Sequence, residues 1–130
     1  MKVLMLNGSS NKNGNTFLAL NEIGRQLEKE GIEYEIFQLG GAPVRDCIGC
    51  CRCTDDGCIF TGDGVNEFIA KAREADGFVF GTPVYYAHPS GRVLSFLDRV
   101  FSAALTALLS SPARLSPWQG AAARPQASTR

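Results

Sequence analysis

The sequence has 130 residues, an apolar content of 45% and a formal net charge of zero. This length predicts a single domain, the apolar content is normal for a globular core, and the neutral charge indicates neither a nucleic-acid nor a membrane partner. No apolar run approaches the roughly 18 residues of a membrane span, and no basic, apolar leader precedes the first predicted strand. We therefore expect a cytoplasmic protein that keeps its thiols reduced.

The charges are distributed unevenly along the chain. Residues 1–101 carry 10 basic and 13 acidic side chains, whereas residues 102–130 carry three arginines and no acid. Residues 110–130 are rich in Ala, Ser, Pro and Arg and show no strand period. We therefore expect a folded part over residues 1–109 and a disordered, low-complexity tail over residues 110–130.

The first two strands and the first helix are predicted from the apolar pattern. Val3–Leu6 is apolar without alternation, which is typical of a parallel strand buried on both faces. The polar loop after it leads into a helix that Asn15 or Thr16 could cap. The alternating run Ile32–Phe37 predicts a second strand nearer the sheet edge. The apolar face predicted for the helix consists of Phe17, Leu20, Ile23 and Leu27.

The second half of the folded part predicts a further strand between two helices. We expect Asp63 to cap the first of these helices and Ser90 to cap the second. The strand between them, residues 77–82, is apolar throughout, as expected for burial on both faces. The apolar face of the first helix is predicted to contain Val65, Phe68, Ile69 and Ala72. That of the second is predicted to contain Val93, Leu97, Val100, Phe101, Ala104 and Leu108.

Strands that alternate with helices predict an α/β fold with a parallel sheet and helices on both faces. We expect the strand order 2-1-3, with the first strand in the centre. The carboxyl ends of parallel strands meet at one edge of a sheet, where such folds bind ligands. The loops over residues 8–16 and 82–91 both leave carboxyl ends, so the sequence predicts that they converge on one crevice.

The loop over residues 7–16 has the composition of an anion site. Glycine, serine and asparagine let backbone N–H groups turn inward, and the following helix adds unpaired donors and a partial positive charge. The loop lacks both the G-x-G-x-x-G pattern of dinucleotide sites and the Walker pattern. A hydroxyl-rich loop of this kind suits a terminal phosphate monoester, and the alternative is an ordinary polar turn.

Five cysteines lie between residues 47 and 58. Cys47, Cys50, Cys53 and Cys58 follow the spacing C-x2-C-x2-C-x4-C, which could supply four thiolates to a [4Fe–4S] cluster. A zinc site and a metal-free loop with reduced thiols remain open as alternatives. Cys51 is predicted to be a spare, and we assign no catalytic role to His88, the single histidine.

At this point the chain resembles the flavodoxin-like NAD(P)H-dependent FMN reductase family, and within it the iron–sulfur flavoproteins. The resemblance is carried by residues 7–16, 81–86, 90–91 and 97–99, together with the cysteine segment. It implies an FMN cofactor, NAD(P)H as reductant and electron transfer, with a [4Fe–4S] cluster as a second cofactor. The residues it places around the FMN phosphate are Ser9, Ser10, Asn11, Asn15 and Thr16. Those it places around the isoalloxazine ring are Pro83, Val84, Tyr85 and Tyr86.

The chain departs from the family pattern beyond about residue 101. Flavodoxin-like domains have five strands, and we predict only three, so strands four and five and the third flavin loop lack counterparts here. We interpret this as truncation or a frameshift near that position. The alternative function is therefore a non-catalytic fragment or a small metal-binding module without flavin. In the full-length family the resemblance implies a homo-oligomer and an electron-transfer protein as partner.

Overall fold

A computed structural model describes residues 1–110 of the chain. The tail predicted over residues 110–130 lies outside the described residues except for its first position, and so does the side chain of Leu108. The described elements, in chain order, are β1 (Lys2–Asn7), α1 (Asn15–Lys29), β2 (Glu33–Gln38), α2 (Val65–Ala72), β3 (Gly77–Gly81), β4 (Val84–Tyr85), β5 (His88–Pro89) and α3 (Gly91–Ser110).

The main sheet consists of three parallel strands in the order β2-β1-β3, which confirms the predicted topology. β1 is the central strand, and Leu4 lies between Glu35 of β2 and Phe78 of β3 in the register. Its residues from Val3 to Asn7 are all buried, as an apolar run without alternation predicts. A parallel sheet with helices on both faces is the flavodoxin-like arrangement, so the fold class is as predicted.

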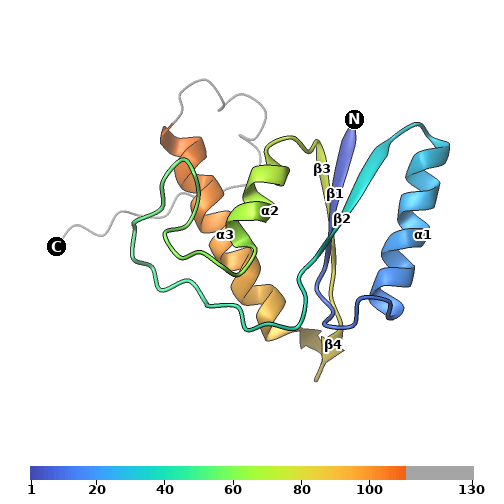
Figure 1. Ribbon diagram of the computed structural model, residues 1–130, viewed down its shortest axis with the longest axis horizontal. Coiled ribbons are helices and arrows are strands. Elements are labelled where there is room, and N and C mark those ends of the chain that lie inside the picture. The colour runs from blue at the N-terminus through green and yellow to red at the C-terminus, as the bar shows by residue number, and fades with distance from the viewer. Residues whose placement is uncertain (111–130) are drawn as a thin grey trace.

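Helices cover both faces of this sheet, with α1 on one side and α2 and α3 on the other (Figure 1). On the α1 side, Val3 and Met5 pack with Leu20. On the other side, three phenylalanines form the centre of the core: the Phe37 and Phe68 ring centroids lie 5.3 Å apart, and those of Phe68 and Phe96 lie 5.4 Å apart. The two clusters place the whole apolar surface of β1 out of water.

Several apolar residues that the sequence predicts to be buried are exposed in the structure. β3 alternates in burial, and the side chains of Phe78 and Phe80 are 38% and 40% exposed, so the expectation of burial on both faces is wrong for this strand. Ile23 of α1 and Phe101 of α3, both predicted to face inward, are also exposed. A sheet of three strands is too narrow to cover the full apolar width of its helices, which leaves these positions at the margin.

The predicted N-caps of α1 and α2 are wrong, whereas the predicted position of Ser90 before α3 is correct. α1 and α2 begin after the glycines Gly14 and Gly64, and no side-chain hydrogen bond caps either N-terminus among the described residues. Asp63 therefore does not cap α2, because its carboxylate is bound elsewhere. Ser90 directly precedes α3 as predicted, and its carbonyl accepts the N–H of Leu94 at 3.1 Å.

Candidate functional site

The loops that follow β1 and β3 meet at the same end of the sheet, as predicted. The N–H of Gly8 donates to the carbonyl of Gly81 at 2.8 Å, so the two loops are joined where they begin. A Cβ at Gly8 would lie 2.2 Å from Cγ2 of Val93 and 2.8 Å from the Gly81 carbonyl oxygen. Glycine at position 8 is therefore what allows the first turn of α3 to approach the end of β1.

A pair of amide side chains braces the loop after β1. Asn7 is fully buried, its Nδ2 donates to Oε1 of Gln38 at 2.7 Å, and its Oδ1 accepts the N–H of Ser9 at 3.2 Å. Nε2 of Gln38 in turn donates to the Ser9 carbonyl at 2.7 Å. The sequence analysis did not predict these hydrogen bonds. The sequence feature that could have indicated them is that β1, apolar up to Leu6, ends in a polar residue, because a buried polar side chain needs a hydrogen-bond partner.

Within the loop, side chains satisfy part of the backbone. Oγ of Ser9 accepts the N–H of Asn11 at 3.1 Å, and Oδ1 of Asn11 accepts the N–H of Asn13 at 3.2 Å. These two predicted phosphate ligands therefore also shape the loop. Ser10 is exposed beside them. The Ser9 hydroxyl keeps its own hydrogen as a donor, because the bond it makes to Asn11 uses only a lone pair.

The N-terminus of α1 has the features of an anion site. In the described residues no side chain caps it, and no acidic residue lies in its first turn. Thr16 is half-buried, and a Cβ at Gly81 would lie 2.8 Å from Cγ2 of Thr16, so the two loops contact each other closely there. Open backbone donors beside a threonine hydroxyl fit a phosphate group. Asn15, also predicted as a ligand, is exposed in the same turn.

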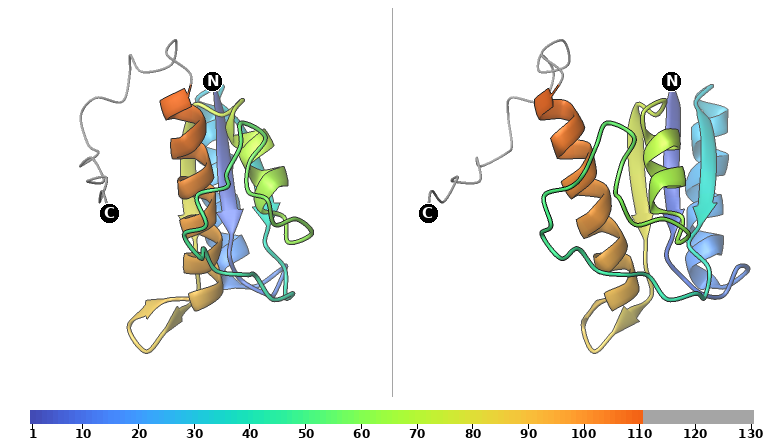
Figure 2. Two further views of the ribbon diagram at one scale, coloured as in Figure 1. Left: turned by 90° about the vertical axis from the view of Figure 1, so that its left-hand side faces the viewer. Right: turned by 60° about the vertical axis from the view of Figure 1, so that its left-hand side comes forward.

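The loop after β3 forms a small antiparallel hairpin, β4–β5, that projects from the sheet end (Figure 2). Tyr86 and Ala87 turn the hairpin with φ angles of 49° and 65°. Val84, Tyr85 and Tyr86 are exposed, Tyr86 completely. Three of the residues predicted around a flavin ring therefore lie on an open hairpin and not in a closed wall. Pro83 precedes the hairpin, where the Thr82 hydroxyl donates to its carbonyl at 3.0 Å.

The cysteine segment belongs to a long connection that runs from β2 across α3 and returns to α2 (Figure 2). Arg99 of α3 is 1% exposed and holds this connection in place. Its guanidinium donates to the carboxylate of Asp63, to the carbonyl oxygens of Arg45 at 3.2 Å and Phe60 at 2.8 Å, and to Sγ of Cys58 at 3.4 Å. Burial alone would lower the pKa of Arg99, but the hydrogen bonds to Asp63 and Cys58 raise it.

Sequence reasoning missed the role of Arg99, although a signal for it existed. Arg99 lies at helical spacing between Phe96, Val100 and Ala103, all of which are buried. A cation within the apolar face of a helix must find acceptors in the core. This pattern could have indicated that buried acceptors exist, but not that they belong to the cysteine connection.

The described residues contain no group of three or more Cys, His, Asp or Glu side chains arranged to hold a metal ion. Two of the cysteine sulfurs have polar neighbours outside the cysteine set. Sγ of Cys47 lies 3.6 Å from the Ser102 hydroxyl, and Cys51 is exposed with its sulfur 3.5 Å from the Gly49 carbonyl. The structure therefore shows no formed metal group among the described residues, and the assignment of the four cysteines as ligands stays a prediction.

Cys53 and Cys58 differ from the other cysteines because both pack against the main core cluster. Burial raises the pKa of the Cys53 thiol, and the neighbouring Cys58 is the next largest cause. The Asn66 side chain binds both backbone groups of Cys58, with two hydrogen bonds of 2.8 Å. The segment around Cys58 is therefore fixed by contacts with α2 and α3.

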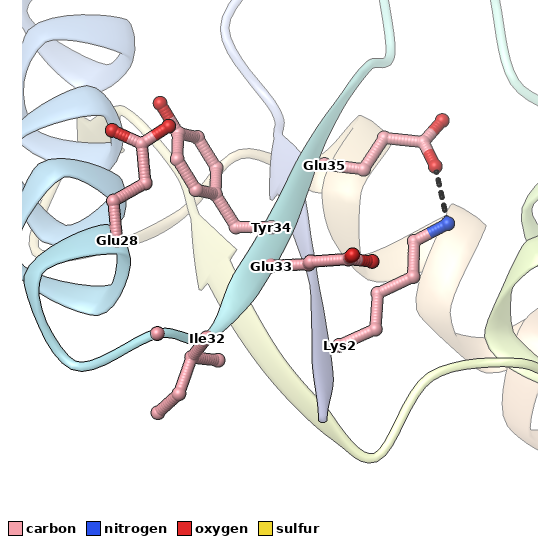
Figure 3. Close-up of a pocket in the computed structure, with 7 residues that line it drawn as sticks. Lys2, Glu28, Ile32, Glu33, Tyr34 and Glu35 are labelled. Carbon is pink, nitrogen blue, oxygen red and sulfur yellow. Dashed lines mark ion pairs between the residues drawn. The ribbon is translucent and has the colours of Figure 1, made fainter.

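The opposite end of the sheet carries a hollow with different chemistry (Figure 3). It is lined by Glu28, Ile32, Glu33 and Tyr34, with Lys2 and Glu35 forming an ion pair of 3.1 Å at its margin. Glu35 also pairs with Lys71 at 2.6 Å, and this hydrogen bond is the main cause of its lowered pKa. The hollow lies at the amino ends of β1 and β2, away from both predicted flavin loops.

Comparison with known proteins identifies what the chain is similar to. The model of the NADPH-dependent FMN reductase family matches residues 1–130. An iron–sulfur flavoprotein of Methanocaldococcus jannaschii is 37% identical over 99 residues, covering 76% of this chain and 51% of that protein. An iron–sulfur flavoprotein of Archaeoglobus fulgidus is 37% identical over 99 residues, covering 76% and 48%.

A more distant relative is the FMN-dependent NADPH-azoreductase of Staphylococcus saprophyticus, 28% identical over 102 residues, covering 77% of this chain and 52% of that protein. The chain thus spans about half the length of the curated relatives it matches. No helix among the described residues is long and apolar enough to cross a membrane.

Proposed function

Because this chain belongs to the NADPH-dependent FMN reductase family, we propose that it binds FMN where the loops after β1 and β3 meet. The observation that carries the proposal is the open N-terminus of α1, which has no side-chain cap and no acidic residue in its first turn. The 2.8 Å hydrogen bond between Gly8 and Gly81 brings the second loop to the same place.

The phosphate of FMN would bind at the start of α1. The backbone N–H groups of the first turn and the helix dipole favour an anion there. The hydroxyls of Ser9 and Thr16 add donors, and the hydrogen-bonded pair of buried Asn7 and half-buried Gln38 holds the loop in shape before any ligand binds. The further ligands that we propose are Ser10, Asn11 and Asn15.

The isoalloxazine ring would lie beside the β4–β5 hairpin. We assign Pro83, Val84, Tyr85 and Tyr86 to it, because an aromatic side chain can stack on the ring and loop backbone can donate to its edge. Their exposure in the described structure leaves this apolar surface available to a ligand. An open hairpin contributes less burial than a closed pocket would, so the phosphate end carries most of the expected affinity.

When bound, FMN would supply the hydride chemistry, accepting a hydride from NAD(P)H and passing electrons to an acceptor. The residues of this chain would bind and orient the cofactor, and we propose no acid–base residue. Cys47, Cys50, Cys53 and Cys58 remain the proposed ligands of a [4Fe–4S] cluster, and no electron-transfer step is assigned to it because the described residues contain no formed metal group. An electron-transfer protein as acceptor and assembly into a homo-oligomer are further proposals for the whole protein.

The decisive experiment compares FMN with riboflavin, which lacks the phosphate, by titrating flavin fluorescence against the protein. Two charge-assisted hydrogen bonds, at about 1.5 kcal/mol each, correspond to roughly a hundredfold difference in Kd. Thr16→Val removes one donor with little change in shape and should weaken FMN about tenfold while leaving riboflavin unchanged. Thr61→Val, an exposed threonine in the cysteine connection, is the matched control.

Equal affinity for FMN and riboflavin would contradict the phosphate site. Absence of binding for both flavins would favour the alternative of a fragment or metal-binding module. If FMN binds with the expected phosphate preference, oxidation of NADH and NADPH can then be compared spectrophotometrically with the same preparation. That measurement tests the reductase activity separately from the binding site.

A further inference from the structure

The chain contains two Asn–Gly pairs, Asn7–Gly8 and Asn13–Gly14, and both lie at the loop after β1. Asparagine followed by glycine is chemically labile, because the nitrogen of the next residue can attack the side-chain carbonyl carbon and glycine carries no side chain to hinder it. The reaction requires that the asparagine side chain and the glycine N–H both be free to move. Hydrogen bonds and burial therefore decide which of the two pairs reacts.

The Asn7–Gly8 pair is fixed by hydrogen bonds. Asn7 is fully buried, its Nδ2 donates to Gln38 at 2.7 Å, and its Oδ1 accepts the N–H of Ser9 at 3.2 Å. The N–H of Gly8 donates to the carbonyl of Gly81 at 2.8 Å. Attack within this pair would break all three hydrogen bonds and leave buried polar groups unpaired. We therefore expect Asn7 to be inert while the protein is folded.

The Asn13–Gly14 pair lacks these restraints. Asn13 is exposed, and no hydrogen bond to its side-chain amide is present within residues 1–110. The N–H of Gly14 lies 3.4 Å from the carbonyl oxygen of Asn11, beyond the usual range of about 2.7–3.2 Å for such bonds. The glycine nitrogen can therefore approach the Asn13 side chain at the loss of one weak hydrogen bond.

We propose that Asn13 is a site of spontaneous deamidation, which adds a negative charge to the loop after β1. The nitrogen of Gly14 attacks Cγ of Asn13 and forms a C–N bond, the side-chain amide leaves as ammonia, and a succinimide ring closes. Water then opens the ring at either of its carbonyl carbons and gives aspartate or isoaspartate at position 13. The net reaction consumes one water molecule and releases one ammonia molecule, and it needs no enzyme or oxidant.

The modification would change the charge beside the proposed phosphate site. Residue 13 directly precedes Gly14, the N-cap residue of α1, and Lys12 is the only charged residue in the loop over residues 7–16. A carboxylate at position 13 would cancel that charge and compete with a phosphate for the partial positive charge of the helix N-terminus. The helix itself should persist, because an acidic residue at this end stabilises it. This consequence rests on the proposed function, whereas the deamidation itself does not.

The experiment is peptide mapping of the 130-residue protein during incubation at mildly alkaline pH, with and without guanidinium chloride. Trypsin separates the two pairs, because peptide 3–12 contains Asn7 and peptide 13–25 contains Asn13. In the folded protein we expect peptide 13–25 to gain the mass of an amide-to-acid exchange at Asn13, whereas peptide 3–12 stays unchanged. In the denatured protein both peptides should change at similar rates. A zero-time sample corrects for deamidation during digestion.

Three variants separate the chemistry from its consequence. Gly14→Ala should strongly slow the change in peptide 13–25, because a methyl group hinders the attack. Its Cβ would lie 3.2 Å from the exposed side chain of Asn11, which can move aside. Asn13→Asp, which mimics the product, should weaken FMN binding about tenfold and leave riboflavin binding unchanged. Gln26→Glu makes the same exchange at an exposed position farther along α1 and is the matched control, with FMN affinity unchanged.

Each outcome bears on one part of the proposal. Equal rates for the two peptides in the folded protein, or an unmodified Asn13 there, would overturn the deamidation. An Asn13→Asp protein that binds FMN as tightly as a wild type that prefers FMN to riboflavin would overturn the effect of the charge. If the wild type shows no such preference, the proposed phosphate site fails, and the peptide map still decides the deamidation by itself.

Discussion

Arg99 offers the sharpest test of how the cysteine connection is held. Its side chain is 1% exposed and that of Asp63 is 12% exposed, so the pair is almost entirely removed from water. The second carboxylate oxygen of Asp63 is buried and has no hydrogen-bond partner among the described residues. Arg99 is therefore the principal compensation for a buried negative charge, and it also satisfies two backbone carbonyls.

We expect Arg99→Met, which keeps most of the side-chain length, to lower the free energy of unfolding by about 3 kcal/mol. Breaking a buried ion pair from one side costs roughly 3–5 kcal/mol. The lower end applies because some water reaches Asp63. This loss is large against a total stability of about 5–15 kcal/mol for a domain. Urea denaturation followed by far-UV circular dichroism measures it.

The double variant Arg99→Met/Asp63→Leu separates the charge from the packing. Removing both partners eliminates the uncompensated carboxylate, so the double variant should be more stable than Arg99→Met by about 1–2 kcal/mol. Arg25→Met is the matched control: its ion pair with Glu22 is exposed and should contribute less than about 1 kcal/mol. An Arg99→Met protein as stable as the wild type, or a double variant less stable than the single, would refute the reasoning.

Two further predictions concern other parts of the fold. Gly8→Ala should lower the free energy of unfolding by about 1–3 kcal/mol, because its Cβ would clash with Val93. Adding Val93→Ala should restore part of this loss. Gly41→Ala is the control and should be neutral, because only Ser10 lies near its Cβ, at 3.8 Å. Glu35→Gln should destabilise the protein near pH 7 by up to about 1 kcal/mol. The hydrogen bond from Lys71 lowers the Glu35 pKa below its ordinary value of 4.5. The difference in unfolding free energy between the wild type and Glu35→Gln should therefore vanish as the pH falls through this lowered pKa, because Glu35 is then protonated. A difference that stays constant in urea titrations at several pH values would contradict the assignment.

The sheet could be predicted from the sequence because each strand has a local signature. Val3–Leu6 is apolar without alternation, and only a central parallel strand buries both faces in that way. Ile32–Phe37 alternates, and β2 is indeed an edge strand. The convergence of the two loops followed from the topology alone, because parallel strands place their carboxyl ends together.

The path of the cysteine connection could not be predicted, because long-range contacts determine it. The hydrogen bond between Arg99 and the Arg45 carbonyl joins residues 54 positions apart. The spacing of four cysteines limits how far apart their Cα atoms can be, but it does not fix the directions of their sulfurs. In the described structure those directions follow from Arg99, Asn66 and the core cluster. The position of Arg99 on an apolar helix face indicates that it needs buried acceptors, but nothing in the sequence indicates which segment supplies them.

The last prediction concerns β3, which the sequence predicts to be buried on both faces but which is an edge strand of the sheet in the described residues. Among the described residues β3 pairs only with β1, and it carries no charge or proline that would discourage pairing with another strand. Phe78 and Phe80 stack with centroids 6.3 Å apart, and Phe80 meets the exposed Phe101 edge-on.

We therefore expect association of the 130-residue chain to increase with concentration in sedimentation velocity. Phe80→Lys should weaken it at least tenfold, whereas Leu18→Lys, an exposed apolar position on α1, should not. Equal association of both variants would show that the β3 edge is not the contact.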